Sequence, residues 1–184
     1  MPSSPQIDLI SRKYREAFGA SARPDYADWM QAGAGRAEAA AALGYRRASA
    51  GPLFLEAYLD QPVEALVSAR LGRGIERAAI VEIGNFAADN ALAMVELWGS
   101  AANDLGGESE VAVATLTAPL RRMFTRIGLP ITVIAAASPD RLGEGAARWG
   151  SYYAQDPMVC MGVIAEGQTA LAAFLARRNR RAAA

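Results

Sequence analysis

Apolar residues recur at two different spacings along the chain, and the change between them predicts where helices and strands lie. Ile7, Ile10, Tyr14 and Phe18 follow the spacing of one helix face, and Gly19 follows where that helix can end. Later segments are short, and their apolar residues fall on both faces, as in buried strands. These predicted strands span residues 79–87, 111–116, 131–137 and 158–165.

Helical segments are expected between these strands. Asp89 or Asn90 can cap a long helix that Gly106 and Gly107 end, and Pro119 suits the first turn of another. We expect helices over 62–70, 89–105 and 119–127, helix-like segments over 53–59 and, interrupted by glycine, 138–153, and a basic terminal helix over 169–181.

The segments near the N-terminus carry mixed signals. Residues 26–31 are compatible with a strand, and the turn at 33–35 allows 36–48 to return beside it. Alanine dominates 38–43 and by itself favours a helix. We prefer the hairpin, because a short segment between turn signals fits it.

The order of these elements predicts an α/β (α+β) fold with a mostly buried central sheet flanked by helices on both faces. No repeat or low-complexity linker divides the chain, so we expect one domain over 1–184. Its predicted parts are an N-terminal helix and hairpin (1–50), a core (51–168) and a basic C-terminal helix (169–184). Ligands of such sheets bind where strands end and their order switches, and the strand ending near Asn85 is our candidate.

Composition and charge exclude several classes of function. The chain has 184 residues, 52% of them hydrophobic and 21% charged, which is typical of a globular protein. Nineteen basic and nineteen acidic residues argue against a general nucleic-acid binder. The absence of histidine excludes His bases and Ser-His-Asp arrangements, so we predict no metal site and no tightly bound cofactor. Cys160 is a lone cysteine in an apolar segment, and we expect a buried structural thiol.

The N-terminal residues have neither the basic region nor the apolar region of a secretory signal. No run reaches the roughly 18 apolar residues that a membrane-spanning helix needs. We therefore expect a cytoplasmic protein.

Three blocks of sequence resemble the thermostable hemolysin family. They are Leu53–Glu64, Ile80–Ala88, and the run from Val113–Arg122 to Trp149–Tyr153. That family is in turn similar to the GNAT acyltransferase superfamily, and most closely to its acyl-homoserine-lactone synthase branch. The synthases carry Glu-x-Ser-Arg before a long helix, where this chain has Glu82-Ile-Gly-Asn85. The resemblance implies a GNAT-like mixed sheet.

The chain departs from GNAT enzymes in two places. Many of them cradle the coenzyme A pyrophosphate in a Gly-rich turn, whereas residues 86–91 here contain no glycine and include Asp89, which would repel that anion. Many also use a tyrosine as general acid where this chain has Phe124. These departures make an acyl carrier protein or a long acyl thioester the favoured donor.

The resemblance and the strand ends together indicate candidate residues. Glu82 is a candidate general base, or else a carboxylate paired with an arginine; Asn85 is a candidate for orienting a thioester, or else a capping residue. For acyl-donor binding we predict Phe86, Ala87, Thr115, Thr117, Arg121 and Arg122. For the substrate pocket we predict Glu56, Tyr58, Trp149, Tyr152 and Tyr153, and one of the last two tyrosines can replace the acid missing at Phe124.

The leading hypothesis is an acyltransferase that moves an acyl group from an acyl-carrier-protein or acyl-CoA thioester to a small amine or hydroxyl acceptor. A membrane-active hemolysin-like protein and a catalytically silent GNAT-like binding module are the alternatives. Expected partners are the acceptor and an acidic carrier protein, without nucleic acid. Contact with a membrane is expected only through Arg177–Arg181.

Overall fold

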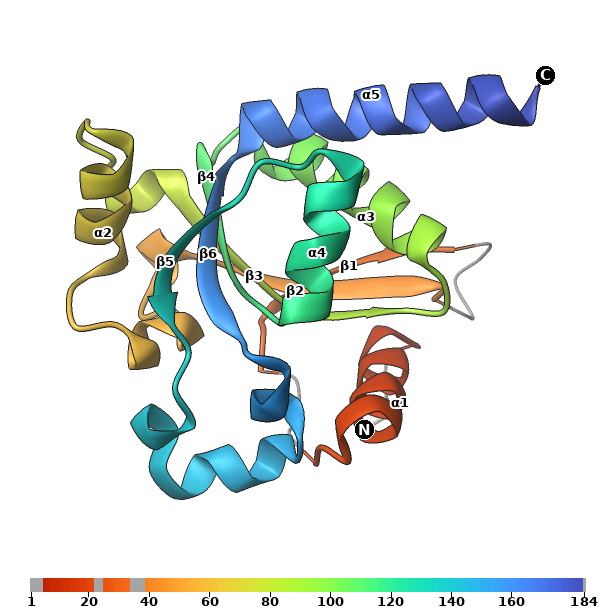
Figure 1. The fold of residues 1–184 in the computed structure, drawn as a ribbon. Helices are drawn as coiled ribbons and strands as arrows, with labels where there is room; N and C mark the ends of the chain where they lie inside the picture. Colours follow the sequence, from red (N-terminus) through yellow and green to blue (C-terminus); the bar gives the residue numbers. More distant parts are fainter. Residues whose placement is uncertain (1–4, 22–24, 34–38, 184) are drawn as a thin grey trace.

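Six strands form one mixed sheet in the order β1-β2-β3-β4-β6-β5. The computed structural model describes residues 5–21, 25–33 and 39–183 (Figure 1). The strands are β1 (Asp28–Ala32), β2 (Ala41–Arg47), β3 (Ile80–Ala88), β4 (Val111–Leu116), β5 (Thr132–Ala136) and β6 (Met158–Val163). Neighbouring strands are antiparallel, except that β3 and β4 run parallel.

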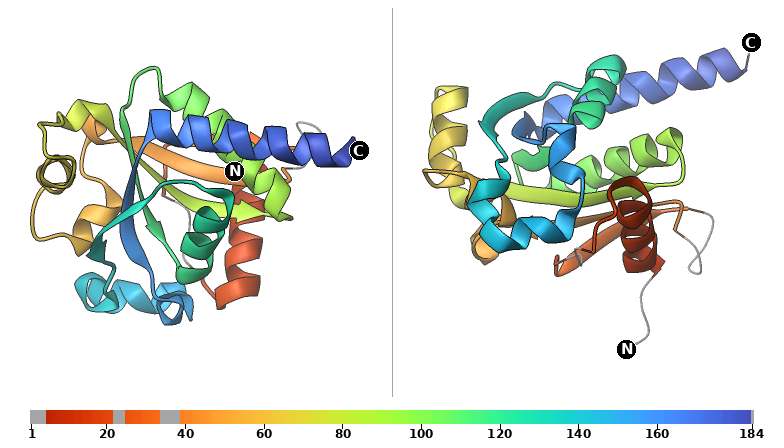
Figure 2. Two further views of the ribbon diagram at one scale, coloured as in Figure 1. Left: turned by 45° about the horizontal axis from the view of Figure 1, so that its top comes forward. Right: turned by 60° about the horizontal axis from the view of Figure 1, so that its bottom comes forward.

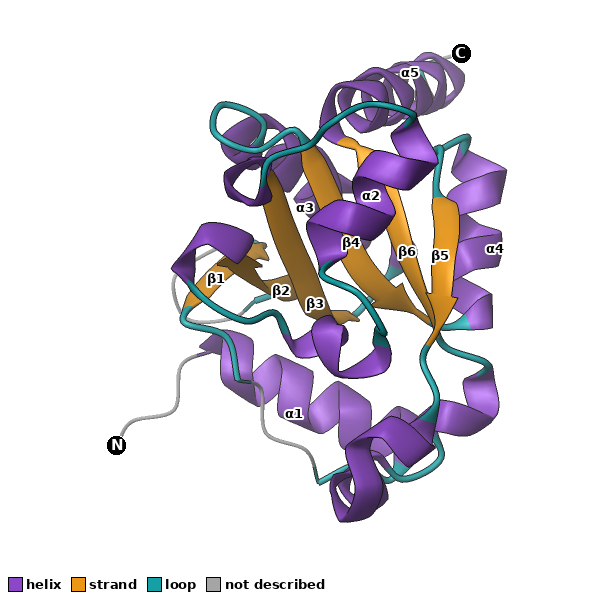
Figure 3. Ribbon diagram, turned by 90° about the vertical axis from the view of Figure 1, so that its left-hand side faces the viewer, coloured by secondary structure: helices purple, strands orange, loops and turns teal. Residues whose placement is uncertain are grey.

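Helices cover both faces of the sheet, which confirms the expected mixed α+β architecture (Figures 2 and 3). The helices are α1 (Pro5–Phe18), α2 (Val63–Leu71), α3 (Ala91–Leu105), α4 (Ala118–Ile127) and α5 (Ile164–Ala182). One apolar core joins α3, α4 and α5 to the sheet, and a second joins α2 and the short 3-10 helix η2 (Phe54–Tyr58) to its other face. Helix α1 packs against β2 and β3.

Local sequence explains where several helices begin and end. The Asn90 side chain accepts a hydrogen bond from the Ala93 N–H at 2.9 Å, so Asn90, rather than Asp89, caps α3. Gly128 ends α4 with φ of 81°, a left-handed conformation that suits glycine. The expected hairpin is confirmed, since β1 pairs with β2 from Asp28↔Tyr45 to Ala32↔Ala41. Residues 34–38 of its predicted span lie outside the described residues.

The structure corrects three of the predicted elements. The apolar strand predicted at 131–137 is β5 at the sheet edge, where Val133 is 41% exposed, because β6 inserts between it and β4. The last strand ends at Val163, and 164–168 belong to α5. The two helix-like segments form 3-10 turns, namely η2 and, split by Gly143, η4 (Pro139–Trp149) followed by η5 (Tyr152–Gln155).

Helix α5 extends past the sheet at its C-terminal end (Figure 1). Its first half buries Ile164 and Leu171 against the core. Its last turns carry exposed arginines that form no salt bridge within the described residues, namely Arg177, Arg178, Arg180 and Arg181.

Candidate functional site

The parallel strands β3 and β4 separate part-way along their length. They pair from Ile80↔Val111 to Glu82↔Val113, and the described pairing between them ends there. Beyond Glu82, strand β3 continues beside β2 through an irregularity in register between Ala42 and Gly44. This leaves a notch between the end of β3 and the end of β4, bounded at its apex by Glu82.

Asn85 lies on β3 at this irregularity. Its φ is 52°, a left-handed conformation that residues other than glycine adopt infrequently and that clusters at functional sites. The bulge gives β3 one residue more than the facing part of β2. The sequence prediction placed Asn85 near a strand end, and the structure places it inside the bulged strand.

Side chains alternate between the two faces of the sheet, so the notch is bordered by two different environments. On the face covered by α3, α4 and α5 lies an apolar cavity of about 110 Å³, whose lining includes Phe86, Ala114, Phe124, Cys160 and Leu171. On the other face lies a smaller pocket of about 50 Å³. We call it the aromatic pocket, and its lining residues are Tyr14, Asp25, Tyr26, Phe54, Tyr58, Glu82, Gly84, Asn85, Thr115, Trp149 and Tyr152.

Glu82 is the buried carboxylate of the aromatic pocket, only 1% exposed. Its two oxygens accept hydrogen bonds from the main-chain N–H groups of Phe54 at 2.8 Å and Leu55 at 3.0 Å. Burial raises the pKa of Glu82, although these bonds, the Tyr26 hydroxyl and the charge of Arg46 each oppose the rise. A carboxylate held in place, with its pKa moved toward neutrality, is suited to accept a proton.

Tyr26 reaches Glu82 across two glycines. Its hydroxyl lies close enough to the Glu82 carboxylate to lower the pKa of that carboxyl. A Cβ at Gly84 would lie 2.2 Å from that hydroxyl oxygen, and a Cβ at Gly44 would lie 2.6 Å from the ring. The absence of side chains at both positions is therefore what allows Tyr26 to approach the carboxylate.

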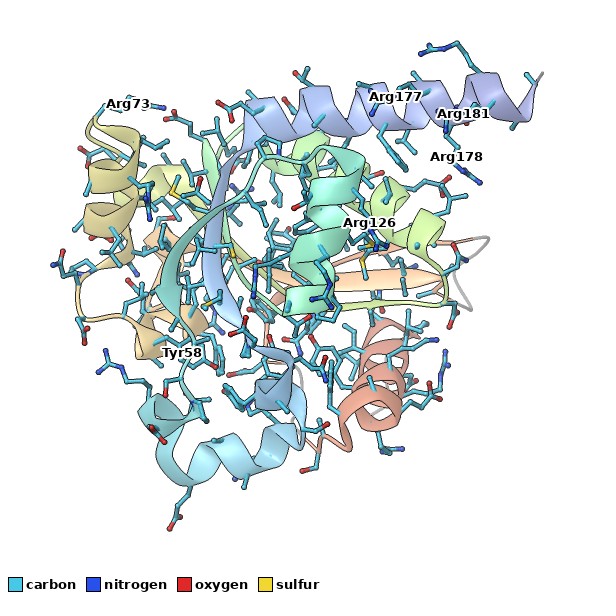
Figure 4. The ribbon with its side chains drawn as sticks, viewed as in Figure 1. Tyr58, Arg73, Arg126, Arg177, Arg178 and Arg181 are labelled. Carbon is cyan, nitrogen blue, oxygen red and sulfur yellow. The ribbon has the colours of Figure 1, made fainter. Side chains whose placement is uncertain are left out.

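Aromatic rings form much of the pocket wall. Phe54 lies between Tyr58 and Trp149, with ring centroids 6.0 and 5.7 Å away, and Trp149 lies 5.4 Å from Tyr152. The hydroxyl oxygens of Tyr58 and Tyr153 are 2.7 Å apart. Burial and this contact raise the pKa of Tyr58, so the pair is neutral at ordinary pH. Tyr58 lies below the sheet in Figure 4, near the 3-10 segments.

Thr115 brings an unsatisfied polar atom to the pocket. Its hydroxyl oxygen is buried and has no hydrogen-bond partner, while its carbonyl accepts a bond from the Tyr152 hydroxyl at 3.4 Å. Buried polar atoms without partners are infrequent in folded proteins and call for an explanation such as a ligand or water.

Several residues predicted for the site have structural partners instead. Glu56 is paired with both guanidinium nitrogens of Arg77, at 2.7 and 2.8 Å, and accepts the Leu53 and Val63 N–H groups. The Arg77 guanidinium holds the pKa of Glu56 at about 2. Glu56 therefore links η2 to Arg77 and does not line the aromatic pocket.

Arg121 likewise links separate segments, here Leu116 at the end of β4 and Asp156 before β6. It donates to the carbonyls of Leu116 and Asp156, both at 2.6 Å, and pairs with the Asp156 carboxylate at 2.6 Å. Thr117 precedes α4 as its buried cap residue, and Arg122 is exposed on that helix. These three predicted donor-binding residues lie outside the lining of both cavities.

The predicted pair on β3 divides between two environments. Phe86 lines the apolar cavity and contacts Trp98, with ring centroids 5.6 Å apart. Ala87 is buried against Leu9 and Ile10 of α1. Phe124 packs on Trp98 at 4.0 Å between ring centroids, so it is part of the apolar wall.

Asp89, which the sequence predicts to repel an anion, lies at the N-terminal end of α3. Its carboxylate lies 2.9 Å from Lys13 and 3.3 Å from Arg12, both on α1. Two cations therefore compensate the charge that would otherwise repel an anion there.

Five residues of the aromatic pocket are not among those that the sequence predicts for the site, namely Tyr14, Asp25, Tyr26, Phe54 and Gly84. Tyr14 was assigned to a helix face, and Tyr26 to the start of a strand. The two glycines opposite Tyr26 were a usable signal, because a glycine inside a strand often marks a close approach.

Comparison with protein families gives a match over residues 4–168 to the family described as thermostable hemolysin. The chain belongs to the thermostable hemolysin family. No curated protein sequence matches it.

Solved structures share the fold of this thermostable hemolysin family member at low identity. The apo form of TofI is 19% identical, with a TM-score of 0.59, and the match covers 93% of this chain and 90% of TofI. A CoA-dependent acyl-homoserine lactone synthase, BjaI, solved with SAM and isopentyl-CoA, is 15% identical, with a TM-score of 0.60 and coverage of 94% and 80%. FeeM, an N-acyl amino acid synthase from uncultured soil microbes, is 14% identical, with a TM-score of 0.56 and coverage of 88% and 90%.

Within 5–21, 25–33 and 39–183, no group of three or more acidic or cysteine side chains is arranged to hold a metal ion. Over the same residues, no helix combines the length and apolar character needed to span a bilayer.

Proposed function

We propose that the protein is an acyltransferase that moves an acyl group from a thioester to a small amine or hydroxyl acceptor. The observation that carries the proposal is the notch between β3 and β4. A buried carboxylate stands at its apex, an apolar cavity borders one face and a polar aromatic pocket borders the other. The fold shared with acyl-homoserine lactone and N-acyl amino acid synthases supports the same reaction class.

Glu82 is the proposed general base. It takes a proton from the acceptor nucleophile, directly or through water, as that nucleophile attacks the thioester carbonyl carbon. The carbon–sulfur bond then breaks, and the thiolate leaves and takes up a proton. The hydrogen bonds from Phe54 and Leu55 fix the carboxylate, so that little reorganisation accompanies the transfer.

The thioester is proposed to lie in the notch. Its acyl chain fits the apolar cavity, since Phe86, Ala114 and Leu116 line that cavity where the strands separate. Asn85 offers an amide donor to the carbonyl oxygen from the bulged strand, and Thr115 offers its unpaired hydroxyl.

A tyrosine is proposed to return the proton to the leaving thiolate in place of Phe124. Tyr58 is the best-placed candidate, because it lines the aromatic pocket and its hydroxyl contacts that of Tyr153. The Tyr152 hydroxyl is engaged with the Thr115 carbonyl and has less freedom to transfer a proton.

An acidic acyl carrier protein is the proposed donor, with acyl-CoA as the other candidate. Arginines on α4 and α5, two of the helices that cover the apolar cavity, form a basic face, and Figure 4 labels Arg126, Arg177, Arg178 and Arg181 on these two helices. None of them has a salt bridge within the described residues. Such a face attracts a protein with acidic helices.

A membrane-active protein is the second candidate, because the same arginines at the end of α5 can attract anionic lipid. Vesicle leakage distinguishes the two: leakage that depends on Arg177–Arg181 and persists in Glu82→Gln favours the second candidate.

The decisive experiment is mass spectrometry after incubating the protein with panels of acyl-carrier-protein and acyl-CoA thioesters and a pool of amines and alcohols. Loss of the acyl group from one donor, with a new acylated acceptor, both dependent on Glu82, is the expected result. If no donor is consumed and none binds, the acyltransferase proposal is wrong. The protein is then a silent binding module or membrane-active.

A further inference from the structure

We propose that residues 144–149 form a lid over the aromatic pocket, with Gly143 and Gly150 as its hinges and Trp149 as the side chain that closes it. The movement is a property of the fold and can be tested without any acyl donor. Its use, which is to admit an acceptor and then exclude water, rests on the proposed function.

Two glycines with the same unusual conformation lie at the ends of this segment. Gly143 has φ of 54° and ψ of −131°, and Gly150 has φ of 55° and ψ of −128°. This is the mirror image of extended backbone, which glycine adopts readily and residues with a Cβ avoid. Gly145, between them, has no positive φ. A few positions that absorb large changes of φ and ψ are enough to make a hinge, so the six residues between the two glycines can rotate as a unit.

Few contacts hold the segment in place. It belongs to η4, none of whose residues is fully buried, and Figure 1 shows the turns of η4 below the sheet. Within the segment, Ala146 and Trp149 are half-buried and the other four residues are exposed. Glu144 and Arg148 form no salt bridge within the described residues. A segment with so little buried apolar surface opens at a far smaller free-energy cost than the whole fold.

Ring contacts and a main-chain hydrogen bond close the lid in this structure. The ring of Trp149 lies 5.7 Å from that of Phe54 on η2 and 6.1 Å from that of Tyr14 on α1. All three rings line the aromatic pocket, so Trp149 bridges η2 and α1 across it. The carbonyl of Arg148 accepts a hydrogen bond from the Ser21 N–H at 2.8 Å.

The closed pocket is small for the acceptor of an acyl transfer. Its volume of about 50 Å³ holds about four groups of water size. A larger acceptor enters only if a wall moves, and Trp149 stands on a segment without a fully buried side chain. Closure after entry keeps bulk water away from the thioester, which water would otherwise hydrolyse to a carboxylic acid and a thiol.

Amide hydrogen exchange of the whole protein, followed residue by residue by NMR, tests the movement. The Ser21 N–H loses its acceptor on Arg148 whenever the lid opens, whereas the Ser151 N–H bonds to the Phe18 carbonyl outside the hinges and is the internal reference. Gly143→Ala places a Cβ at φ of 54° with nothing within 4 Å, so it strains the closed backbone without a clash. We expect Ser21 exchange to become about 5- to 150-fold faster and Ser151 exchange to stay unchanged.

Gly145→Ala is the matched control. It adds the same methyl group inside the lid, at a residue without positive φ, where the new Cβ lies 4.0 Å from Leu142. Exchange of Ser21 should stay within about two-fold of the unsubstituted protein. Equal Ser21 exchange in the two variants overturns the proposed lid. Acceleration of Ser151 by the same factor as Ser21 also overturns it, because a larger unit is then opening.

A reversible cross-link tests whether the lid controls access to the pocket. Ser21→Cys with Arg148→Cys places two thiols on main chains that are hydrogen-bonded, and their disulfide should hold the lid closed, while Cys160 stays buried. The oxidised variant should transfer acyl groups at least about 10-fold more slowly, and reduction should restore the rate. An undiminished rate in the oxidised variant overturns the gating role. If the unsubstituted protein acylates nothing, the proposed function is wrong, and amide exchange alone decides the movement.

Discussion

Replacing Glu82 by glutamine should lower the acyl-transfer rate strongly while changing the stability of the fold only a little. Glutamine has the same shape as glutamate but cannot take up a proton at neutral pH. A general base contributes about 10²- to 10⁴-fold to a rate. We therefore expect the acyl-transfer rate of Glu82→Gln to fall by that factor, which corresponds to about 3–5 kcal/mol of activation free energy.

The structural cost of this substitution follows from the two main-chain donors. Glutamate accepts both the Phe54 and Leu55 N–H groups, whereas the glutamine oxygen accepts one and its NH₂ group faces the other. A buried N–H without an acceptor costs about 1–3 kcal/mol. Removing a buried charge offsets part of this, so we expect a net loss of at most about 2 kcal/mol, or a Tm lower by roughly 4–8 °C.

The pH dependence gives a second readout. Because burial raises the pKa of Glu82, the transfer rate should fall as pH decreases through that raised value. In the folded state the neutral form is favoured, so Glu82 contributes stability below its unfolded pKa, and this is lost as pH rises through the folded pKa. The stability advantage of the unsubstituted protein over Glu82→Gln should therefore shrink as pH rises, as measured by urea unfolding at several pH values.

Glu64→Gln is the control for this experiment. The Glu64 carboxylate forms a half-buried salt bridge with Arg77 at 2.8 Å, but it lies outside the aromatic pocket. It should leave the transfer rate within a few-fold of the unsubstituted value. The reasoning is refuted if folded Glu82→Gln retains near-normal transfer with an unchanged pH profile.

Three further predictions follow from other contacts. Arg77 lowers the pKa of Glu56 to about 2, so Glu56 should contribute roughly 1–2 kcal/mol to the free energy of unfolding above pH 4.5, and this contribution should be lost as pH falls toward 2. Unfolding measured at several acidic pH values should show this loss, and Glu56→Gln should abolish it. Gly84→Ala should displace the Tyr26 hydroxyl and lower the transfer rate, and an unshifted Tyr26 in a crystal structure of the variant would contradict this. Ala114→Leu should shift the donor preference toward shorter acyl chains, by about 10-fold or more for each methylene excluded, and unchanged chain-length selectivity in a thioester panel would show that the chain binds elsewhere.

Local sequence determined much of the secondary structure, because its signals act over a few residues. The spacing of apolar residues predicted helix α1, although the residues it buries are Leu9 and Ile10, with Tyr14 packed against them, and Asn90 supplied the cap of α3. The apolar segment 111–116 coincides with β4. Glu82 stood out because a carboxylate inside an apolar strand must be paired or functional.

The order of the strands was decided only by tertiary structure. The segment at 131–137 is as apolar as a central strand, yet β5 lies at the edge, since β6 pairs with β4 across all six of its residues and displaces β5 outward. Hydrophobic pattern reports that a residue is apolar, but not which neighbour covers it.

The roles of the polar residues were likewise decided by distant partners. Glu56 and Glu82 are both carboxylates beside apolar residues, but Arg77 pairs with Glu56, while two main-chain N–H groups and Tyr26 surround Glu82. The sequence by itself determined that a buried carboxylate stands on β3 and that no histidine can share its work. Only the fold, by separating β3 from β4 and bringing η2, α1 and the 3-10 segments together, decided that this carboxylate faces a pocket.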